Sequence, residues 1–359
     1  MDNLTSDTGG NHALHLAHSA QFDEFYTQYD DIERELNAYL EYDNNVFRDK
    51  TILLPCDDPE WSNFTKYFAQ NFNRLGVKKL ISTSYAQDCK PTREPIQRSL
   101  FEIDNPPYDK SHGKIFTLTR STKLVNIHNL KWKYLDGDGD YQSNEVKMLR
   151  DEADIIVTNP PFSKFRDFVN WVMMANKKML IVGNVNAITY REIFPLIKDN
   201  KLWLGAHSGD MAFRVPNDSE PRPTRFWIDE AGNKWRSLGN IYWFTNLEHG
   251  RRHTPLQLMT MEDNLRFSSH KNHNKFPLLY KKYDNYDAIE VSWVDAIPSN
   301  YNGVMGVPVT FLDKYCPEQF SIMGCSYSYG DPGCHLDNET WNTLISKQNI
   351  YKRLFIKRK

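Results

Sequence analysis

One short segment, Asp154 to Phe162 (DIIVTNPPF), constrains the fold of this chain more than any other. Its β-branched run, Ile155 to Thr158, carries no charge, which is typical of a strand buried on both faces of a parallel sheet. The run ends at Asn159-Pro160-Pro161-Phe162, and we expect Ser163 to cap the helix that follows. The tetrapeptide therefore lies where α/β sheets bind their ligands, at the carboxyl end of a parallel strand.

Strands and helices alternate along the first two hundred residues, and this order predicts a doubly wound α/β sheet. Apolar runs predict strands at 51–55, 78–85, 115–118, 131–135 and 178–183. Helical periodicity predicts helices at 22–40, 61–75 (ended by Gly76), 164–175 and 190–198. After residue 200 the chain becomes rich in aromatic strands, and we expect the one at 240–247 to close the sheet as an antiparallel edge.

Composition excludes several classes of protein. The net charge of −2 gives no overall basic excess, although residues 249–359 hold 14 basic and 11 acidic side chains. The chain shows neither an apolar run of membrane-spanning length nor a secretory signal, so we expect a cytoplasmic protein without a membrane partner. Its five cysteines form no C-x-x-C pair, which argues against a disulfide framework and against a metal site.

The tetrapeptide at Asn159 suits one kind of chemistry. Its two prolines fix φ and remove two backbone donors, so we expect a stiff turn whose carbonyls point outward unpaired. The Asn159 amide oxygen and the Pro160 carbonyl can then accept both hydrogens of one planar –NH2 group, while Phe162 offers a face for a flat ring. Such a grip frees the nitrogen lone pair to attack an electrophile.

Three other motifs compete with this tetrapeptide as the functional site, and each is excluded on physical grounds. Asn105-Pro106-Pro107-Tyr108 has similar letters but neither a buried strand before it nor a helix after it. The acidic turn at 136–140 lacks the glycine and the closing glutamate of a calcium loop. The helicase-like Asp151-Glu-Ala-Asp154 has no phosphate-binding loop to accompany it.

Through its NPPF motif the chain resembles the S-adenosylmethionine-dependent amino-methyltransferases. The runs CDDPEWSNFTKYF, KKLISTSY, ADIIVTNPPFS and GVPVTFLDKYCPEQF more narrowly resemble the EcoRI-type adenine-specific DNA methyltransferases. The resemblance implies a Rossmann-like, mostly parallel seven-stranded sheet, with Asn159, Pro160, Pro161 and Phe162 as the catalytic residues. It also implies transfer of a methyl group from S-adenosyl-L-methionine to N6 of an adenine flipped out of double-stranded DNA, leaving S-adenosyl-L-homocysteine.

The same resemblance assigns the cofactor site. The chain departs from the family pattern in two places: its first loop has no glycines, and its second strand ends without a carboxylate. We therefore expect Asp57 or Asp58 to bind the ribose. The full set of expected cofactor-binding residues is Phe25, Tyr26, Thr27, Pro55, Cys56, Asp57, Asp58, Tyr85 and Asp140.

We expect three parts in the chain: a flexible leader (1–21), a cofactor-binding catalytic domain (22–248) and a DNA target-recognition region (249–359). The basic residues expected to contact DNA are Arg251, Arg252, Lys271, Lys275, Lys281 and Lys282. A restriction endonuclease of the same system is an expected partner. The alternatives are methylation of another planar amine (cytosine N4, an RNA base or a protein glutamine) and a DNA-binding protein without activity.

Overall fold

The computed structural model describes residues 27–86, 111–120, 130–215, 219–270, 272, 278–326, 343–350 and 352–359. Contacts divide the chain into two compact units. The first holds residues 1–36, 45–184 and 209–242, and the second holds residues 37–44, 185–208 and 243–359. The three functional parts expected from the sequence remain a prediction, because these units are defined by packing alone.

The first unit is built on a large sheet whose centre is parallel. Its central strands are β1 (Thr51–Leu54), β2 (Lys79–Thr83), β5 (Ile155–Thr158) and β6 (Lys178–Asn184). β1 pairs in parallel with β2 and β5, and β5 pairs in parallel with β6. All four residues of β1 and of β5 are buried, as their uncharged sequences predict. The doubly wound α/β class is thereby confirmed.

The sheet has nine described strands rather than the expected seven, in the order β4-β3-β2-β1-β5-β6-β9-β7 with β8 paired to β9. On one side, β3 (Lys114–Thr119) is antiparallel to both β2 and β4 (Lys133–Tyr134). On the other side lie β9 (Lys234–Thr245) and β7 (Trp203–Arg214), both divided between the units, and β8 (Phe226–Ile228). We expected β9 to be an edge strand. It lies instead between β6 and β7, because β7 pairs along its outer side.

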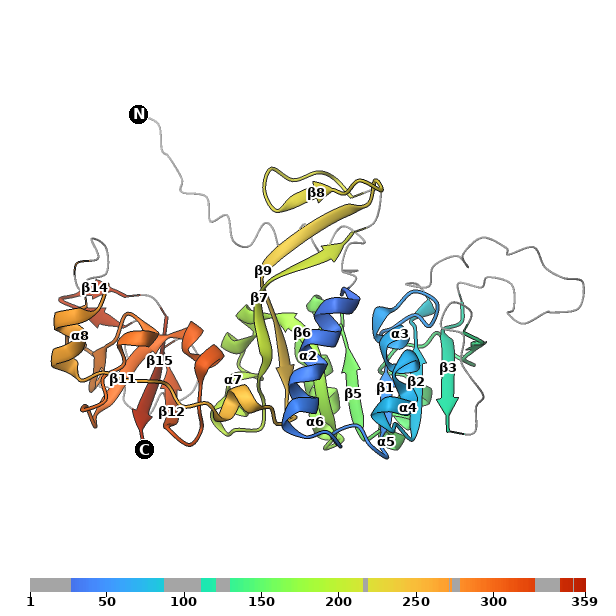
Figure 1. Cartoon of the computed structure of the whole chain (residues 1–359), viewed down its shortest axis with the longest axis horizontal. Helices are drawn as coiled ribbons and strands as arrows, with labels where there is room; N and C mark the ends of the chain where they lie inside the picture. The colour runs from blue at the N-terminus through green and yellow to red at the C-terminus, as the bar shows by residue number, and fades with distance from the viewer. Residues whose placement is uncertain are drawn as a thin grey trace, which may run out of the picture. The chain divides into compact units, whose positions relative to one another are not determined.

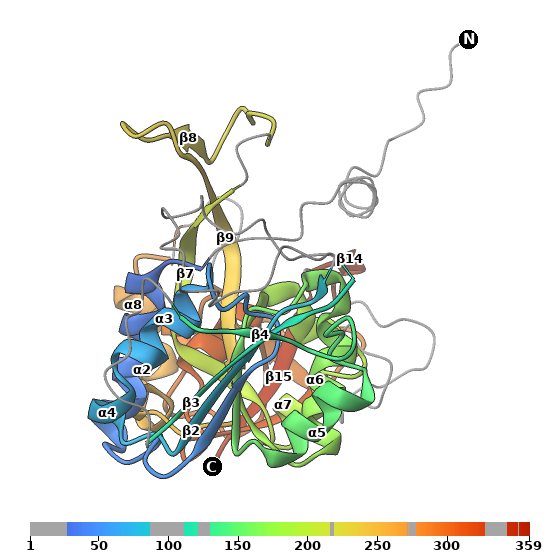
Figure 2. The same ribbon diagram turned by 90° about the vertical axis from the view of Figure 1, so that its right-hand side faces the viewer.

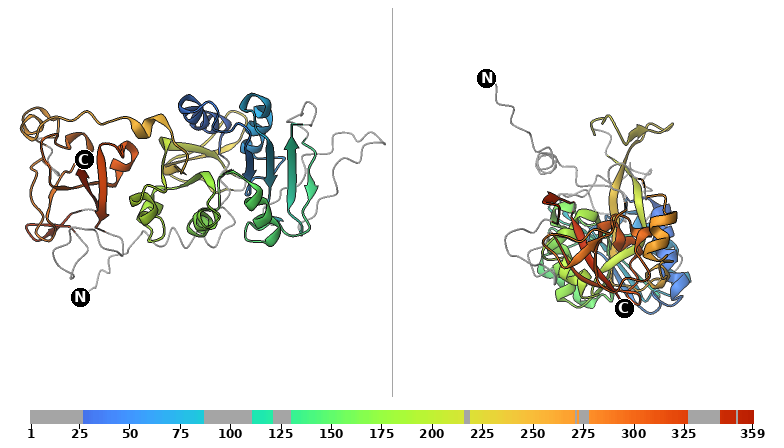
Figure 3. Two further views of the ribbon diagram at one scale, coloured as in Figure 1. Left: turned by 90° about the horizontal axis from the view of Figure 1, so that it is seen from below. Right: turned by 90° about the vertical axis from the view of Figure 1, so that its left-hand side faces the viewer.

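Helices cover both faces of the first unit's sheet (Figures 2 and 3). α3 (Asn63–Gln70) and α4 (Phe72–Leu75) lie on one face, and α5 (Asn144–Glu152) and α6 (Phe165–Met174) lie on the other. The expected helix over 61–75 is broken at Asn71, whose backbone and side-chain N–H groups both donate to the Tyr67 carbonyl. Gly76 ends α4 at φ 64°, as expected. The helix α2 (Tyr29–Tyr42) is divided between the units.

The second unit has its own sheet, in the order β10-β11-β15-β12. Its strands are β10 (Ala288–Glu290), β11 (Val304–Pro308), β12 (Phe320–Cys325) and β15 (Arg353–Arg358). A buried ion pair joins the Arg353 guanidinium to both oxygens of Glu290, at 2.7 to 3.1 Å. The unit also contains α7 (Phe194–Lys198), α8 (Met261–Phe267) and the pair β13 (Leu344–Ile345) and β14 (Gln348–Asn349).

A turn at 136–140 is fastened to the ends of β2 and β3 by close backbone contact. The Ala86 N–H donates to the Asp138 carbonyl at 2.7 Å, and the Gly113 N–H donates to the Gly137 carbonyl at 3.0 Å. Gly139 has φ +77°, and a Cβ at this position would collide with the Ser84 carbonyl. Both its conformation and its surroundings therefore require glycine.

We predict that Gly139→Ala destabilises the protein more than Gly232→Ala does. Gly232 has a similar φ of +80°, but a Cβ added there would meet nothing within 4 Å, so only the left-handed backbone is strained. Gly232→Ala should lower the free energy of unfolding by about 1 kcal/mol. Gly139→Ala should exceed that loss by about 2 kcal/mol, because the methyl group also overpacks the turn. Urea titration compares the two, and equal losses would contradict the packing account.

Candidate active site

The corner at Asn159 contacts Thr27, which lies two residues before the start of α2. The Asn159 side-chain Nδ2 donates to Thr27 Oγ1 at 3.3 Å, and the Asn63 Nδ2 donates to the Thr27 carbonyl at 2.9 Å. Thr27 is 4% exposed. The contact turns the NH2 end of the Asn159 amide toward Thr27 and its oxygen away from it. The structure thus brings together two of the residues expected at the site.

The two prolines of the corner differ in what their carbonyls do. The Pro161 carbonyl accepts the Lys164 N–H at 2.9 Å, because residues 162–164 form a 3-10 turn before α6. The expectation that both carbonyls point outward unpaired is therefore wrong for Pro161. Among the residues that the structure describes, the Pro160 carbonyl has no hydrogen-bond partner. Ser163 also does not cap α6, since the helix begins at Phe165 without a side-chain cap.

Asp57 ties three elements together behind this corner. Its Oδ2 accepts the Thr158 hydroxyl and its Oδ1 accepts the Ser62 hydroxyl, both at 2.6 Å. Ser62 in turn caps α3, accepting the backbone N–H groups of its first turn. Burial of the carboxyl raises the pKa of Asp57 to about 6, against the opposing effect of these two hydrogen bonds. Asp57 thus joins the end of β1, the start of α3 and the residue before Asn159.

Asp58 belongs to a second, largely buried group of charges. Its Oδ2 lies 3.1 Å from the Lys114 ammonium, which also pairs with Glu60 at 2.7 Å and lies over the Trp132 ring. The Lys114 side chain is 1% exposed, whereas those of Asp58 and Glu60 are 11% and 13% exposed. Burial raises the pKa of Asp58, and the nearby Lys114 opposes that rise. Of the two acids expected to bind ribose, Asp58 is the more exposed, and its Oδ1 accepts the Glu60 N–H at 2.9 Å.

Hydroxyl groups replace the missing carboxylate at the end of β2. The Ser82 hydroxyl donates to the Asp57 carbonyl at 2.6 Å, and the Thr83 hydroxyl donates to the Pro55 carbonyl at 3.2 Å. Both side chains are fully buried. They hold the loop after β1 in place, and so a loop without glycines keeps a defined shape.

A lysine not considered in the sequence analysis lies among the expected cofactor residues. The Lys164 ammonium is 3.6 Å from Asp140 and lies near the rings of Tyr85 and Tyr141, at 5.7 and 5.9 Å. Burial raises the pKa of Tyr141 to about 12, with a smaller contribution from the charges of neighbouring acids. Pro55, Cys56, Tyr85 and Asp140 all occupy this edge of the sheet, with Pro55 buried and the others partly exposed. Lys164 follows the tetrapeptide by two residues, which is the one sequence signal that points to it.

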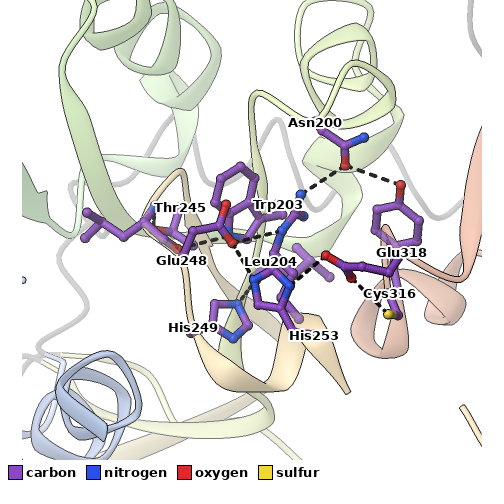
Figure 4. A network of polar contacts seen from close by, with 12 residues as sticks. Asn200, Trp203, Leu204, Thr245, Glu248, His249, His253, Cys316 and Glu318 are labelled. Carbon is purple, nitrogen blue, oxygen red and sulfur yellow. Dashed lines mark hydrogen bonds and ion pairs between the residues drawn. The ribbon is translucent and has the colours of Figure 1, made fainter. Parts of the chain in front are cut away.

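A polar network in the second unit, which includes Asn200, Trp203 and Glu248 (Figure 4), surrounds one of the basic residues expected to contact DNA. Arg252 is only 7% exposed: it stacks on Trp203 at 3.9 Å, donates to Asn200 at 3.0 Å and pairs with Glu248 at 3.2 Å. Burial lowers its pKa, and Glu248 opposes this change. The guanidinium is already held inside the unit, so Arg252 has a structural place and is not a candidate for contacting DNA.

The remaining basic residues of this set are more accessible. Arg251 pairs with Asp313 at 2.6 Å and keeps 37% of its side chain exposed. Lys281 is exposed, and so is Lys282, which pairs with Asp287 at 2.9 Å. Phe25, Tyr26, Lys271, Lys275 and the competing Asn105 lie outside the described residues.

The described ranges contain no group of three or more His, Cys, Asp and Glu side chains arranged to hold a metal ion. The carboxylates of the acidic turn accept backbone N–H groups instead: Asp138 accepts from Asp140 at 3.0 Å, and Asp140 accepts from Gln142 at 2.7 Å. None of the helices in the described ranges combines the length and the apolar character that a membrane crossing requires.

Comparison with known proteins gives a consistent result. Residues 13–359 match the family described as "Adenine-specific methyltransferase EcoRI". The chain is 43% identical to the Type II methyltransferase M.EcoRI of Escherichia coli, over 87% of this chain and 89% of that protein. It is 34% identical to M.MgeORF184P of Mycoplasma genitalium and 33% identical to M.MpnI of Mycoplasma pneumoniae, each over 93% of this chain and more than nine-tenths of the relative. No solved structure matches.

The raised pKa of Asp57 predicts a pH-dependent effect of Asp57→Asn. Since the pKa in the folded protein, about 6, exceeds the ordinary 3.8, the Asp57 contribution favours folding at low pH and declines as pH rises through about 6. The asparagine side chain of the variant does not titrate. The free energy of unfolding of the variant, taken relative to that of wild type, should therefore increase by about 1 to 1.5 kcal/mol between pH 5 and pH 7.5. Urea unfolding at several pH values measures this gain.

The matched control for Asp57→Asn is Asp49→Asn, since the Asp49 side chain is 66% exposed. Its difference from wild type should hardly change over the same range. A constant difference for Asp57→Asn as well would contradict a buried, titrating carboxyl behind the corner.

Proposed function

We propose a set of residue roles for this chain, which belongs to the adenine-specific EcoRI methyltransferase family. It is therefore a site-specific DNA methyltransferase that modifies N6 of adenine. In the proposed reaction, Asn159 Oδ1 and the Pro160 carbonyl accept the two hydrogens of the N6 amino group, and Phe162 stacks on the adenine ring. The observation that carries this proposal is the orientation of the Asn159 amide. Asn159 follows the end of the buried strand β5, and its hydrogen bond to Thr27 fixes that orientation.

Two features of the corner suit it for holding an amine. The amide of Asn159 is held from behind by Thr27 rather than by solvent, so it loses little freedom when it binds. The Pro160 carbonyl has no partner within the described part of the chain, so a bound amine would satisfy it. Once methylated, N6 carries a positive charge and is strongly acidic, so it releases one of its two protons to solvent without a strong base.

The substrate base has to leave the helix to reach this corner. N6 of adenine is paired inside the duplex, and extruding the base costs a few kcal/mol. Phe162 is partly exposed and lies beside Asn159, so it is placed to return part of that cost by stacking. We assign the phosphate contacts to Arg251, Lys281 and Lys282, together with Lys271 and Lys275.

We further propose that the methyl donor is S-adenosylmethionine, which supplies an electrophilic methyl group on a sulfonium. The groups at this edge fit such a molecule, because the partly exposed Asp58 carboxylate can accept ribose hydroxyls and Tyr85 offers a partly exposed ring. Thr27, Pro55 and Cys56 would line the methionine end, with Asp58 facing the ribose and Tyr85 and Asp140 the adenine. Asp57 would hold the loop rather than touch the cofactor, since both of its oxygens already accept hydroxyls.

The relatives are named Type II methyltransferases, and we propose that this chain likewise protects DNA against a restriction endonuclease of the same sequence specificity. The direct test of the reaction is incubation of the protein with labelled S-adenosylmethionine and unmethylated DNA, followed by nucleoside analysis. N6-methyladenine at one recurring sequence is the expected product. N4-methylcytosine, or label on RNA or protein, would contradict the proposal.

We predict that Asn159→Ala lowers methyl transfer at least about a thousandfold, because the amine loses its side-chain acceptor in the transition state. Binding of S-adenosylhomocysteine, measured by calorimetry, should change little. Asn105→Ala, in the similar tetrapeptide, is the matched control and should retain near wild-type turnover. Substantial activity in Asn159→Ala, or its loss in Asn105→Ala, would show that the chemistry does not belong to the corner at Asn159.

A further inference from the structure

The outer parts of β7 and β9, together with β8, form an arm that projects from the sheet of the first unit (Figures 1 and 2). We call residues 219–240, which hold β8 and the outer part of β9, the arm. The first seven residues of β9 are all half-buried, whereas four of its last five are buried. At roughly 3.3 Å per residue, those seven residues reach about 20 Å beyond the buried part of the strand. The arm therefore has no core of its own to cover.

Apolar side chains are nevertheless exposed on the arm. Trp227 is 42% exposed and Ile228 is 56% exposed, and as neighbours in β8 they face opposite sides of the ribbon. Trp227 also stacks on Trp235 of β9, with ring centroids 6.2 Å apart and planes 8° apart. Large apolar groups exposed on both sides of a thin ribbon are typical of a binding surface.

Basic side chains accompany these apolar groups. The arm holds four basic and three acidic residues, and one of the acids, Asp229, is engaged in the turn. Burial of the Arg236 guanidinium and, after it, the charge of Arg222 lower the pKa of Arg236. A phosphate group bound beside Arg222 and Arg236 would offset the repulsion between their charges.

The tip of the arm is held stiff by the carboxylate of Asp229. Its Oδ1 accepts the N–H groups of Ala231 and Asn233, and its Oδ2 accepts Asn233 Nδ2 and Trp235 Nε1, all at 2.8 to 3.0 Å. These bonds lower the pKa of Asp229 to about 2. Trp227 and Ile228 are thus presented on a pre-ordered strand, which lowers the entropy lost on binding.

We propose that the arm is a DNA-binding ribbon that enters the major groove next to the target adenine, with Arg222 and Arg236 on the phosphates and Trp227 and Ile228 against the base edges. This inference rests on the proposed function. A two-stranded β-ribbon fits the width of the major groove, and apolar side chains there contact the thymine methyl group. The arm also projects on the side of the sheet at which β5 ends, which is the side of Asn159 (Figure 1).

The test compares two double variants, Arg222→Gln with Arg236→Gln and Trp227→Ala with Ile228→Ser, by fluorescence anisotropy with a labelled duplex containing the mapped methylation site. Each should weaken duplex binding by about tenfold or more. The arginine pair should also lower the slope of log Kd against log salt by about 1 to 2. Affinity for S-adenosylhomocysteine and the melting temperature should stay unchanged. The control is Met148→Ala with Met174→Ala, two methionines that are 73% and 78% exposed on the same unit.

Tighter duplex binding by wild type than by both double variants would support the proposed role of the arm in binding DNA. Unchanged affinity and salt slope in both variants, while wild type forms N6-methyladenine, would overturn the arm and leave the proposed function intact. If wild type itself neither binds nor methylates duplex DNA, the proposed function fails first. A switch from dimer to monomer in the tryptophan variant, at unchanged duplex affinity, would assign the arm to a second copy of the chain and likewise overturn the proposal.

Discussion

The buried carboxylate of Asp57 is the constraint on which the site depends. Because this carboxylate is buried away from solvent, it accepts hydrogen bonds from the Thr158 and Ser62 hydroxyls instead of from water. These bonds fix the end of β5 to the start of α3. Asn159 follows Thr158 directly, and its amide is held from the other side by Thr27. A stiff diproline corner is useful only if the strand before it cannot shift, and Asp57 supplies that restraint.

Charge is also buried outside the corner, and two of these groups, around Lys114 and Arg252, take partners from distant parts of the chain. Lys114 is enclosed by Asp58, Glu60 and the Trp132 ring, which orders the loop after β1. Arg252 stacks on Trp203 and bonds to Asn200, which orders the second unit. Removing one partner of such a group leaves a costly unpaired charge, so these residues are held together as sets. Lys114 and Arg252 therefore position the loop and the unit rather than bind ligands.

The sequence predicted the parallel centre of the sheet well, because uncharged β-branched runs such as Ile155–Thr158 admit few other structures. It also indicated that Thr27 and Asn159 belong to one site, although only by resemblance. It did not predict the burial of Arg252, because an arginine beside another arginine gives no local sign of a distant tryptophan such as Trp203. The occupied Pro161 carbonyl was missed for a similar reason: a 3-10 turn before α6 leaves no pattern in apolar spacing. The roles of the individual site residues remain proposals.

The most direct measurement is a crystal structure of the protein with its methylation duplex and a non-reactive analogue of S-adenosylmethionine. The account predicts an adenine outside the helix, its N6 about 3 Å from both Asn159 Oδ1 and the Pro160 carbonyl, with Phe162 against the ring. An adenine that stays paired in the duplex, or one whose N6 is held by other groups while the corner at residues 159–162 remains packed against Thr27 alone, would contradict it.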